Sequence, residues 1–117
     1  MSEDNIEALA VALRQFAQDR DWDPFHSPKN LASALIVEAG ELLEHFQWSD
    51  RGAREDLTAR QLEAVTLEMA DVFLYLIRLA DKLDVDLIAA ARRKLEVNAL
   101  KYPVSLARGS SKKYTDL

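Results

Sequence analysis

The segment 65–80, with the sequence VTLEMADVFLYLIRLA, places the strongest constraint on how this chain can fold. Apolar residues cover nearly every side of a helix with this sequence, so such a helix must be buried on more than one side. The chain has 117 residues, which is one domain's worth and too little to surround one of its own helices completely. We therefore expect a second copy of the chain to cover part of this segment, giving a homo-oligomer.

The composition also favours helices and narrows the classes of function. With 3 Gly and 3 Pro the chain lacks the turns of a β-sandwich or barrel, while 49% hydrophobic residues can build a core. A formal net charge of -5 disfavours binding to a nucleic-acid polymer, and the lack of Cys excludes disulfides and thiolate zinc sites. No apolar run approaches the ~20 residues of a membrane span, and no signal-peptide pattern is seen. We expect a cytoplasmic protein without membrane contact.

Capping residues mark where the helices of the first half should begin. Ser2 or Asp4 can cap a first helix. Ser27 followed by Pro28 combines a cap with a first-turn proline, which predicts a second helix that runs to about Trp48.

Two further helices are expected in the second half. Thr58 and Gln61 have the spacing of a capping box and predict a third helix ending near Leu83. Asp84 can cap a fourth helix, which should end before Pro103 because proline interrupts a helix. The predicted fold is an all-α, four-helix bundle-like protomer, a single domain over 1–117 with a polar tail at 103–117.

Four carboxylates interrupt the apolar faces of the second and third predicted helices. Glu38 lies within the apolar arc of its helix and Glu41 at the edge of that arc, while Glu68 and Asp71 interrupt the segment 65–80. Each pair is three residues apart, so both members share one helix face and can hold one divalent cation. Oxygen ligands alone select Mg²⁺ or Mn²⁺ over zinc. Metal binding is therefore preferred over the alternatives, ion pairing and simple exposure.

Two neighbouring residues are given lesser roles. His45 lies one turn after Glu41, but a di-iron bundle needs a Glu-x-x-His unit on each of two helices, and that unit is absent here. His45 is expected to pack at the margin of the core. Glu44 points about 120° away from Glu38, and we expect it to be solvated or to lie behind the ligands, with a catalytic role as the alternative.

Three stretches of the chain carry a family resemblance. They are FHSPKNLASALIVEAGELLEHFQW at 25–48, LEMADVFLYLIRLADKLDVDL at 67–87 and NALKYPVSLARGSSKKYTDL at 98–117. Together they resemble the all-α nucleoside triphosphate pyrophosphohydrolases of the MazG-like superfamily, and within it the dCTP pyrophosphatase group. The superfamily pattern is E-x-x-E followed by E-x-x-D, which Glu38, Glu41, Glu68 and Asp71 match.

The resemblance implies a reaction and a cofactor. It implies Mg²⁺ held by these four carboxylates, with Mn²⁺ as a possible substitute, and hydrolysis between the α and β phosphates to a monophosphate and pyrophosphate. A hard cation would offset the charge of the triphosphate and lower the pKa of a water molecule. Glu38 or Glu41 could then orient or deprotonate that water. The resemblance also implies a homotetramer, with a dimer as the alternative.

The resemblance further indicates residues that would contact the nucleotide. Trp22, His26 and Trp48 lie in segments that match the base-binding stretches of the family, and aromatic rings stack on bases. Without the resemblance, plain core packing would be the preferred interpretation of either tryptophan. The match also implies contacts from the fourth predicted helix to the phosphates or the sugar, made by Lys94, Asn98 and Tyr102.

The sequence therefore predicts an enzyme that hydrolyses dCTP or related, modified pyrimidine deoxynucleotides. A broad-specificity nucleoside triphosphate or dUTP diphosphatase is the alternative within enzymes. A helical, oligomeric interaction protein without activity is the alternative outside them.

Overall fold

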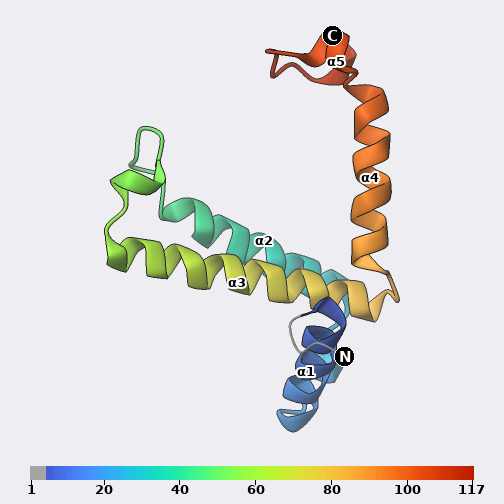
Figure 1. The fold of residues 1–117 in the computed structure, drawn as a ribbon. Helices are drawn as coiled ribbons and strands as arrows, with labels where there is room; N and C mark the ends of the chain where they lie inside the picture. The colour runs from blue at the N-terminus through green and yellow to red at the C-terminus, as the bar shows by residue number, and fades with distance from the viewer. Residues whose placement is uncertain (1–4) are drawn as a thin grey trace. The chain divides into compact units, whose positions relative to one another are not determined.

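The computed structural model describes residues 5–117, and helices are the only regular secondary structure among them (Figure 1). The α-helices are α1 (Ile6–Asp19), α2 (Pro28–Glu44), α3 (Ala59–Lys82), α4 (Leu87–Lys101) and α5 (Val104–Ala107). Short 3-10 helices are η1 (Asp23–Phe25), η2 (Arg54–Asp56) and η3 (Tyr114–Asp116). The predicted all-α class is confirmed. The chain divides into two compact units, one ending at Asp84 and the other Val85–Leu117, and the single domain stays a prediction.

The first unit is built around an antiparallel pair of helices. Helices α2 and α3 lie side by side, and α1 packs against α3 (Figure 1). Leu31 of α2 and Ile77 of α3 are the largest fully buried side chains. Small residues let α1 approach α3 closely, and those buried are Ala10, Ala17 and Ala80.

The helices of this unit begin largely where capping chemistry predicts. The Thr58 hydroxyl accepts a hydrogen bond from the Gln61 N–H, and the Gln61 side chain accepts one from the Thr58 N–H, which confirms the capping box. The Ser27 hydroxyl caps α2 as predicted. Asn5 caps α1, with its side-chain oxygen accepting from the Ala8 N–H at 2.7 Å. The predicted caps Ser2 and Asp4 lie outside the described residues.

Helix α2 ends earlier than predicted, at Glu44 instead of about Trp48. The next residues tighten into a turn in which the N–H groups of His45 and Phe46 bond to carbonyls three residues back. Gly52 follows with φ of 63°, and a Cβ there would lie 2.6 Å from the Phe46 ring. Only glycine fits this turn.

The predicted cap of the fourth helix is wrong by two residues. Asp84 has a φ of 54°, in the left-handed region, whereas an N-cap needs extended backbone. Its N–H instead bonds to the Asp81 carbonyl as α3 ends. Asp86, which is extended, caps α4 by accepting from the Ala89 N–H at 3.0 Å.

The second unit is α4 together with an ordered C-terminal segment. Helix α5 follows Pro103, so the polar tail contains a short helix that the pattern of the sequence does not reveal. The ring of Tyr114 packs edge-on against Tyr102 at 6.1 Å between centroids, and the Lys101 ammonium lies 4.8 Å from the centre of the Tyr114 ring. These contacts tie the end of the chain to the end of α4.

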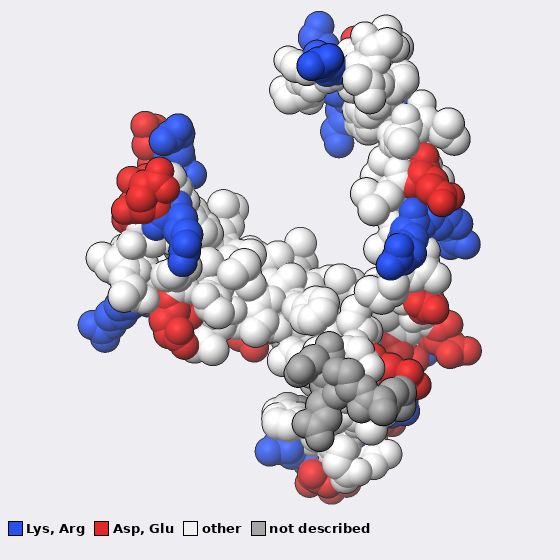
Figure 2. Space-filling view, in the orientation of Figure 1, with Lys and Arg blue, Asp and Glu red and all other residues white. Residues whose placement is uncertain are grey.

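Large apolar side chains remain exposed on both central helices of the first unit. Leu43 of α2 is 66% exposed and Leu67 of α3 is 59% exposed. A largely uncharged surface covers α2 and α3 in Figure 2. Among residues 5–117, no helix combines the length and the hydropathy needed to cross a membrane.

Candidate active site

Three of the four predicted metal ligands come together where α2 and α3 pack side by side. Glu38 and Glu41 of α2 and Glu68 of α3 each offer a carboxylate oxygen, and these oxygens all lie within 4.8 Å of one another. We call these residues the acidic trio. Oxygen ligands surround a divalent cation at about 2.0–2.6 Å, so oxygens on opposite sides of one ion are about 4–5 Å apart. The spacing of the acidic trio fits one such ion.

Glu68, a largely buried member of the acidic trio, has an unsatisfied atom. The Glu68 side chain is 12% exposed, and its Oε2 atom is buried without a hydrogen-bond partner. A buried carboxylate oxygen is costly unless a donor or a cation satisfies it. This atom supports a bound cation, and the three carboxylates of the trio offer the oxygen ligands that a hard cation prefers.

His45 lies beside the acidic trio and not at the margin of the core, where it was expected. Its Nε2 atom is 4.0 Å from Oε1 of Glu68. Helix α2 has ended before this residue, and the tight turn directs the imidazole toward α3. Glu44 is exposed and outside the trio.

Hydrogen bonding between neighbouring carboxyl groups, together with nearby negative charge, raises the pKa of two members of the acidic trio. The pKa of Glu38 is raised by hydrogen bonding with Glu68, by partial burial, and by the negative charges of Glu68 and Asp71. The pKa of Glu41 is raised by hydrogen bonding with Glu38 and by the Glu38 charge. Both shifts follow from placing like charges together, so a bound cation would reverse their cause.

Asp71, the fourth predicted ligand, is not part of the acidic trio. Its charge is near enough to raise the pKa of Glu38, yet its carboxylate lines a neighbouring cavity. Its role as a ligand stays a prediction. Asp71 lies one turn after Glu68, so the acidic trio and the cavity occupy one face of α3.

The cavity has a volume of about 310 Å³ and a mainly apolar lining that includes the rings of Phe16, Trp22 and Tyr75. Helix α1, the turn after it and α3 contribute the lining residues, which are Leu13, Phe16, Trp22, His26, Asp71, Leu74, Tyr75 and Arg78. We call this space the aromatic cavity. The Trp22 ring packs edge-on against Phe16 at 5.8 Å and against His26 at 6.3 Å, centroid to centroid. Two of the predicted base-contacting residues, Trp22 and His26, therefore share one cavity.

A family model described as the MazG-like family matches residues 34–117 of the chain. The chain belongs to the MazG-like family. The matched residues contain the acidic trio, Asp71 and the whole second unit.

Known members of this family closely resemble the chain. It is 42% identical to human dCTP pyrophosphatase 1 over 117 residues, which are 98% of this chain and 69% of the human protein. The bovine dCTP pyrophosphatase 1 is 42% identical over 118 residues, covering 99% and 70% of the two chains. A solved pyrophosphatase from Archaeoglobus fulgidus superposes with a TM-score of 0.77 at 41% identity, covering 84% of this chain and 92% of its own. The predicted family and enzyme class, a nucleoside triphosphate diphosphatase, are confirmed.

The other predicted substrate contacts lie outside the aromatic cavity. Trp48 is in the turn after α2, with 91% of its surface exposed. Lys94, Asn98 and Tyr102 belong to the second unit, where Lys94 is exposed and the other two are half-buried. Their contacts with a nucleotide stay predictions.

Sequence reasoning missed two polar residues of the aromatic cavity, Tyr75 and Arg78. Both follow Asp71 on α3, at four and seven residues, so they share its helix face. That spacing was the available signal. The spacing alone does not identify a binding site, because the cavity forms only when α1 and the following turn pack over that face of α3. That packing is a tertiary contact.

Proposed function

We propose that this MazG-like protein is a Mg²⁺-dependent pyrophosphohydrolase acting on dCTP or a related, modified pyrimidine deoxynucleotide. The products would be the nucleoside monophosphate and pyrophosphate. One observation carries the proposal: a trio of carboxylates with an unsatisfied buried oxygen shares a face of α3 with an aromatic cavity. The names of the human and bovine relatives, dCTP pyrophosphatase 1, support the choice of base.

The acidic trio would hold the cation, with Asp71 as the predicted fourth ligand. When bound, Mg²⁺ supplies positive charge that offsets the charge of the triphosphate and lowers the pKa of the attacking water. Glu41 is exposed and Glu38 half-buried, and either carboxylate can orient that water or accept its proton. A bound cation would remove the cause of the raised pKa values of Glu38 and Glu41, so the carboxylates would be ionised and able to accept a proton.

The aromatic cavity would hold the base. Trp22 offers an aromatic face, and a stacked base gains about 1–3 kcal/mol from such a ring. From Glu68 to Tyr75 the axis of α3 advances about 10 Å at the usual helical rise. A ligand that reaches both sites must therefore be elongated, anionic at one end and planar at the other, as a nucleotide is.

We also propose that the enzyme works as a homo-oligomer, with a tetramer preferred over a dimer. The exposed apolar residues of α2 and α3 are the support, because contiguous apolar surface of this kind marks an interface. A cytoplasmic location stays a prediction from composition.

Hydrolysis in ¹⁸O-labelled water tests the reaction directly. Attack at the α phosphorus places the label in dCMP, which we expect, whereas attack at the β phosphorus places it in pyrophosphate. Formation of dCDP and inorganic phosphate would overturn the proposal. A panel of canonical bases and modified pyrimidines then separates a dCTP enzyme from a broad nucleoside triphosphate or dUTP diphosphatase.

A further inference from the structure

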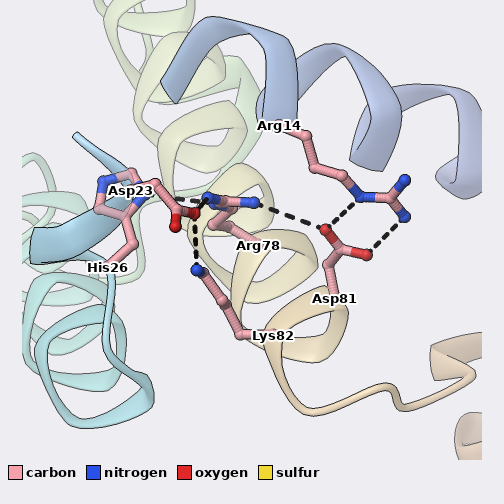
Figure 3. A network of polar contacts seen from close by, with 6 residues as sticks. All are labelled: Arg14, Asp23, His26, Arg78, Asp81 and Lys82. Carbon is pink, nitrogen blue, oxygen red and sulfur yellow. Dashed lines mark hydrogen bonds and ion pairs between the residues drawn. The ribbon is translucent and has the colours of Figure 1, made fainter. Parts of the chain in front are cut away.

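Among the described residues, Arg78 is the one charged residue that is buried, with 5% of its surface exposed. It lines the aromatic cavity together with His26, and Figure 3 shows its guanidinium between Asp23 and Asp81. Its Nε–H donates to His26 Nδ1 at 3.2 Å, and its Nη2–H donates to Asp23 Oδ1 at 2.8 Å. Its Nη1 atom is 3.5 Å from Asp81 Oδ2.

Both ends of the Arg78 guanidinium are held in place. Lys82 donates to the same Asp23 oxygen at 2.6 Å. Arg14 holds Asp81 with two hydrogen bonds of 2.7 Å each. A planar guanidinium with partners on several sides has little freedom to rotate, so the direction of its Nε–H is fixed.

This hydrogen bond decides which nitrogen of His26 carries the proton. Arginine is a donor only, so the Nδ1 atom that faces it must be an unprotonated acceptor. In a neutral imidazole the hydrogen then lies on Nε2. Protonating Nδ1 would set two N–H donors against each other. Nε2, on the far side of the ring in Figure 3, is left as the nitrogen that can contact a ligand.

We propose that Arg78 is a positioning residue that locks His26 as the neutral Nε2–H tautomer and so presents a fixed hydrogen-bond donor to the aromatic cavity. The acceptor would be a carbonyl oxygen or an unprotonated ring nitrogen of the base, an identification that rests on the proposed function. Because the tautomer and the ring orientation are already fixed, ligand binding does not have to select them, and no affinity is lost in doing so.

The surrounding charges also favour the neutral ring. Burial, then the positive charges of Arg78 and Lys82, lower the pKa of His26, and the negative charge of Asp23 opposes them. Asp71 is the acidic residue among those that line the aromatic cavity.

Nitrogen NMR of the ring atoms tests the tautomer on the protein without substrate. The chain has 2 histidines, so a His45→Gln variant assigns the signals. We expect His26 to show a protonated Nε2 and an unprotonated Nδ1 at neutral pH. An Nδ1–H tautomer, or an equal mixture, would overturn the proposal.

Kinetics of Arg78→Met test the consequence, with Arg14→Met as the matched control. Arg14 is a cation of the same network but contacts Asp81 and not His26. For Arg78→Met we expect the KM for dCTP to rise roughly three- to tenfold, the worth of one hydrogen bond. The kcat should be unchanged, and so should the KM for deoxyribose triphosphate, which has no base. Arg14→Met leaves the hydrogen bonds from Arg78 to His26 and Asp23 in place, so the KM values and the His26 tautomer should stay parental.

Three results would count against Arg78 as a positioning residue. These are an unchanged KM for dCTP, an equal rise with the base-free triphosphate, and an unchanged His26 tautomer in the variant. If Arg78→Met does not fold, Arg78→Lys keeps a positive charge between Asp23 and Asp81 but replaces the fixed Nε–H by a flexible ammonium group, and the KM for dCTP should rise in the same direction. Failure of the proposed function would give a different result, because the parental protein itself would then not release pyrophosphate from any nucleotide.

Discussion

Replacing Glu68 by Gln should make the protein more stable without Mg²⁺ and less responsive to it. The Glu68 side chain is 12% exposed and carries the unsatisfied Oε2 atom. Glutamine keeps nearly the same shape, removes one negative charge and adds an amide that can donate to a neighbouring carboxylate. Repulsion in the metal-free protein should therefore fall.

The size of this gain follows from the spacing of the carboxylates. At the 4.8 Å limit of the trio, two like charges repel by about 0.9 kcal/mol in water and about 3.5 kcal/mol at an effective dielectric of about 20. Glu38 is partly solvated and salt screens the pair, so the lower figure applies to the Glu38–Glu68 pair. A gain of about 1 kcal/mol raises the Tm of a domain of this size by about 4 °C.

Added Mg²⁺ should reverse the order of the two melting temperatures, so that the parent becomes more stable than Glu68→Gln. A ligand at about one hundred times its Kd stabilises the folded state by about 2.7 kcal/mol. Each tenfold loss of affinity removes about 1.4 kcal/mol of that gain, and Glu68→Gln loses a charged ligand. Melting curves with EDTA and with a Mg²⁺ titration measure both effects.

Glu63→Gln is the matched control for this experiment. It makes the same chemical change on an exposed part of α3 outside the acidic trio, so its Mg²⁺ response should be parental. If Glu68→Gln keeps the full Mg²⁺-dependent rise in Tm, then Glu68 holds no metal and the reasoning fails.

Four further outcomes are expected. Trp22→Ala should weaken dCTP binding by about 1–3 kcal/mol, measured as a higher KM. Trp48→Ala should weaken binding by a similar amount but leave Tm unchanged, because Trp48 is 91% exposed. A parental KM in either variant would exclude stacking by that tryptophan. The Asp81 pKa is lowered from 3.8 by the hydrogen bond from Arg14 and then by its charge, so this carboxylate stabilises the fold above pH about 4 and loses that effect as pH falls further. Urea unfolding at neutral and acid pH should show less acid destabilisation in Asp81→Asn than in the parent, and an equal loss would contradict the ion pair. Light scattering should give a mass several times 13.2 kDa, whereas a stable monomer would rule out the proposed oligomer.

Helix positions could be predicted because local chemistry decides them. Thr58 and Gln61 cap α3 through contacts three residues apart, which are visible in the sequence. The failure at Asp84 has a physical reason: Asp84 and Asp86 are both good caps, and the left-handed backbone that ends α3 excludes the first of them. That choice depends on how the preceding helix terminates, which residue type alone does not reveal.

The acidic trio could be predicted from helical phase, whereas the aromatic cavity could not. Glu38, Glu41 and Glu68 each fall within or beside the apolar faces that pair α2 with α3, so pairing the helices brings them together. The aromatic cavity requires the end of α1 and the next turn to close over α3. This packing is non-local, so Trp22 and His26 were identified through a family resemblance and not through periodicity.

Two charged residues within the apolar segment of α3, Glu68 and Arg78, lead to opposite interpretations once their contacts are known. Glu68 and Arg78 are both largely buried, and either could be taken from sequence as half of a buried ion pair. Arg78 has its hydrogen bonds satisfied by His26 and Asp23, so its burial needs no ligand. Glu68 keeps an oxygen without a partner, and the only nearby side chain that can carry a positive charge in the described ion pairs is His45, at 4.0 Å. A satisfied buried charge holds other groups in position, whereas an unsatisfied one indicates a missing partner. On this ground we propose that the cation binds at Glu68 and that Arg78 positions the base contact.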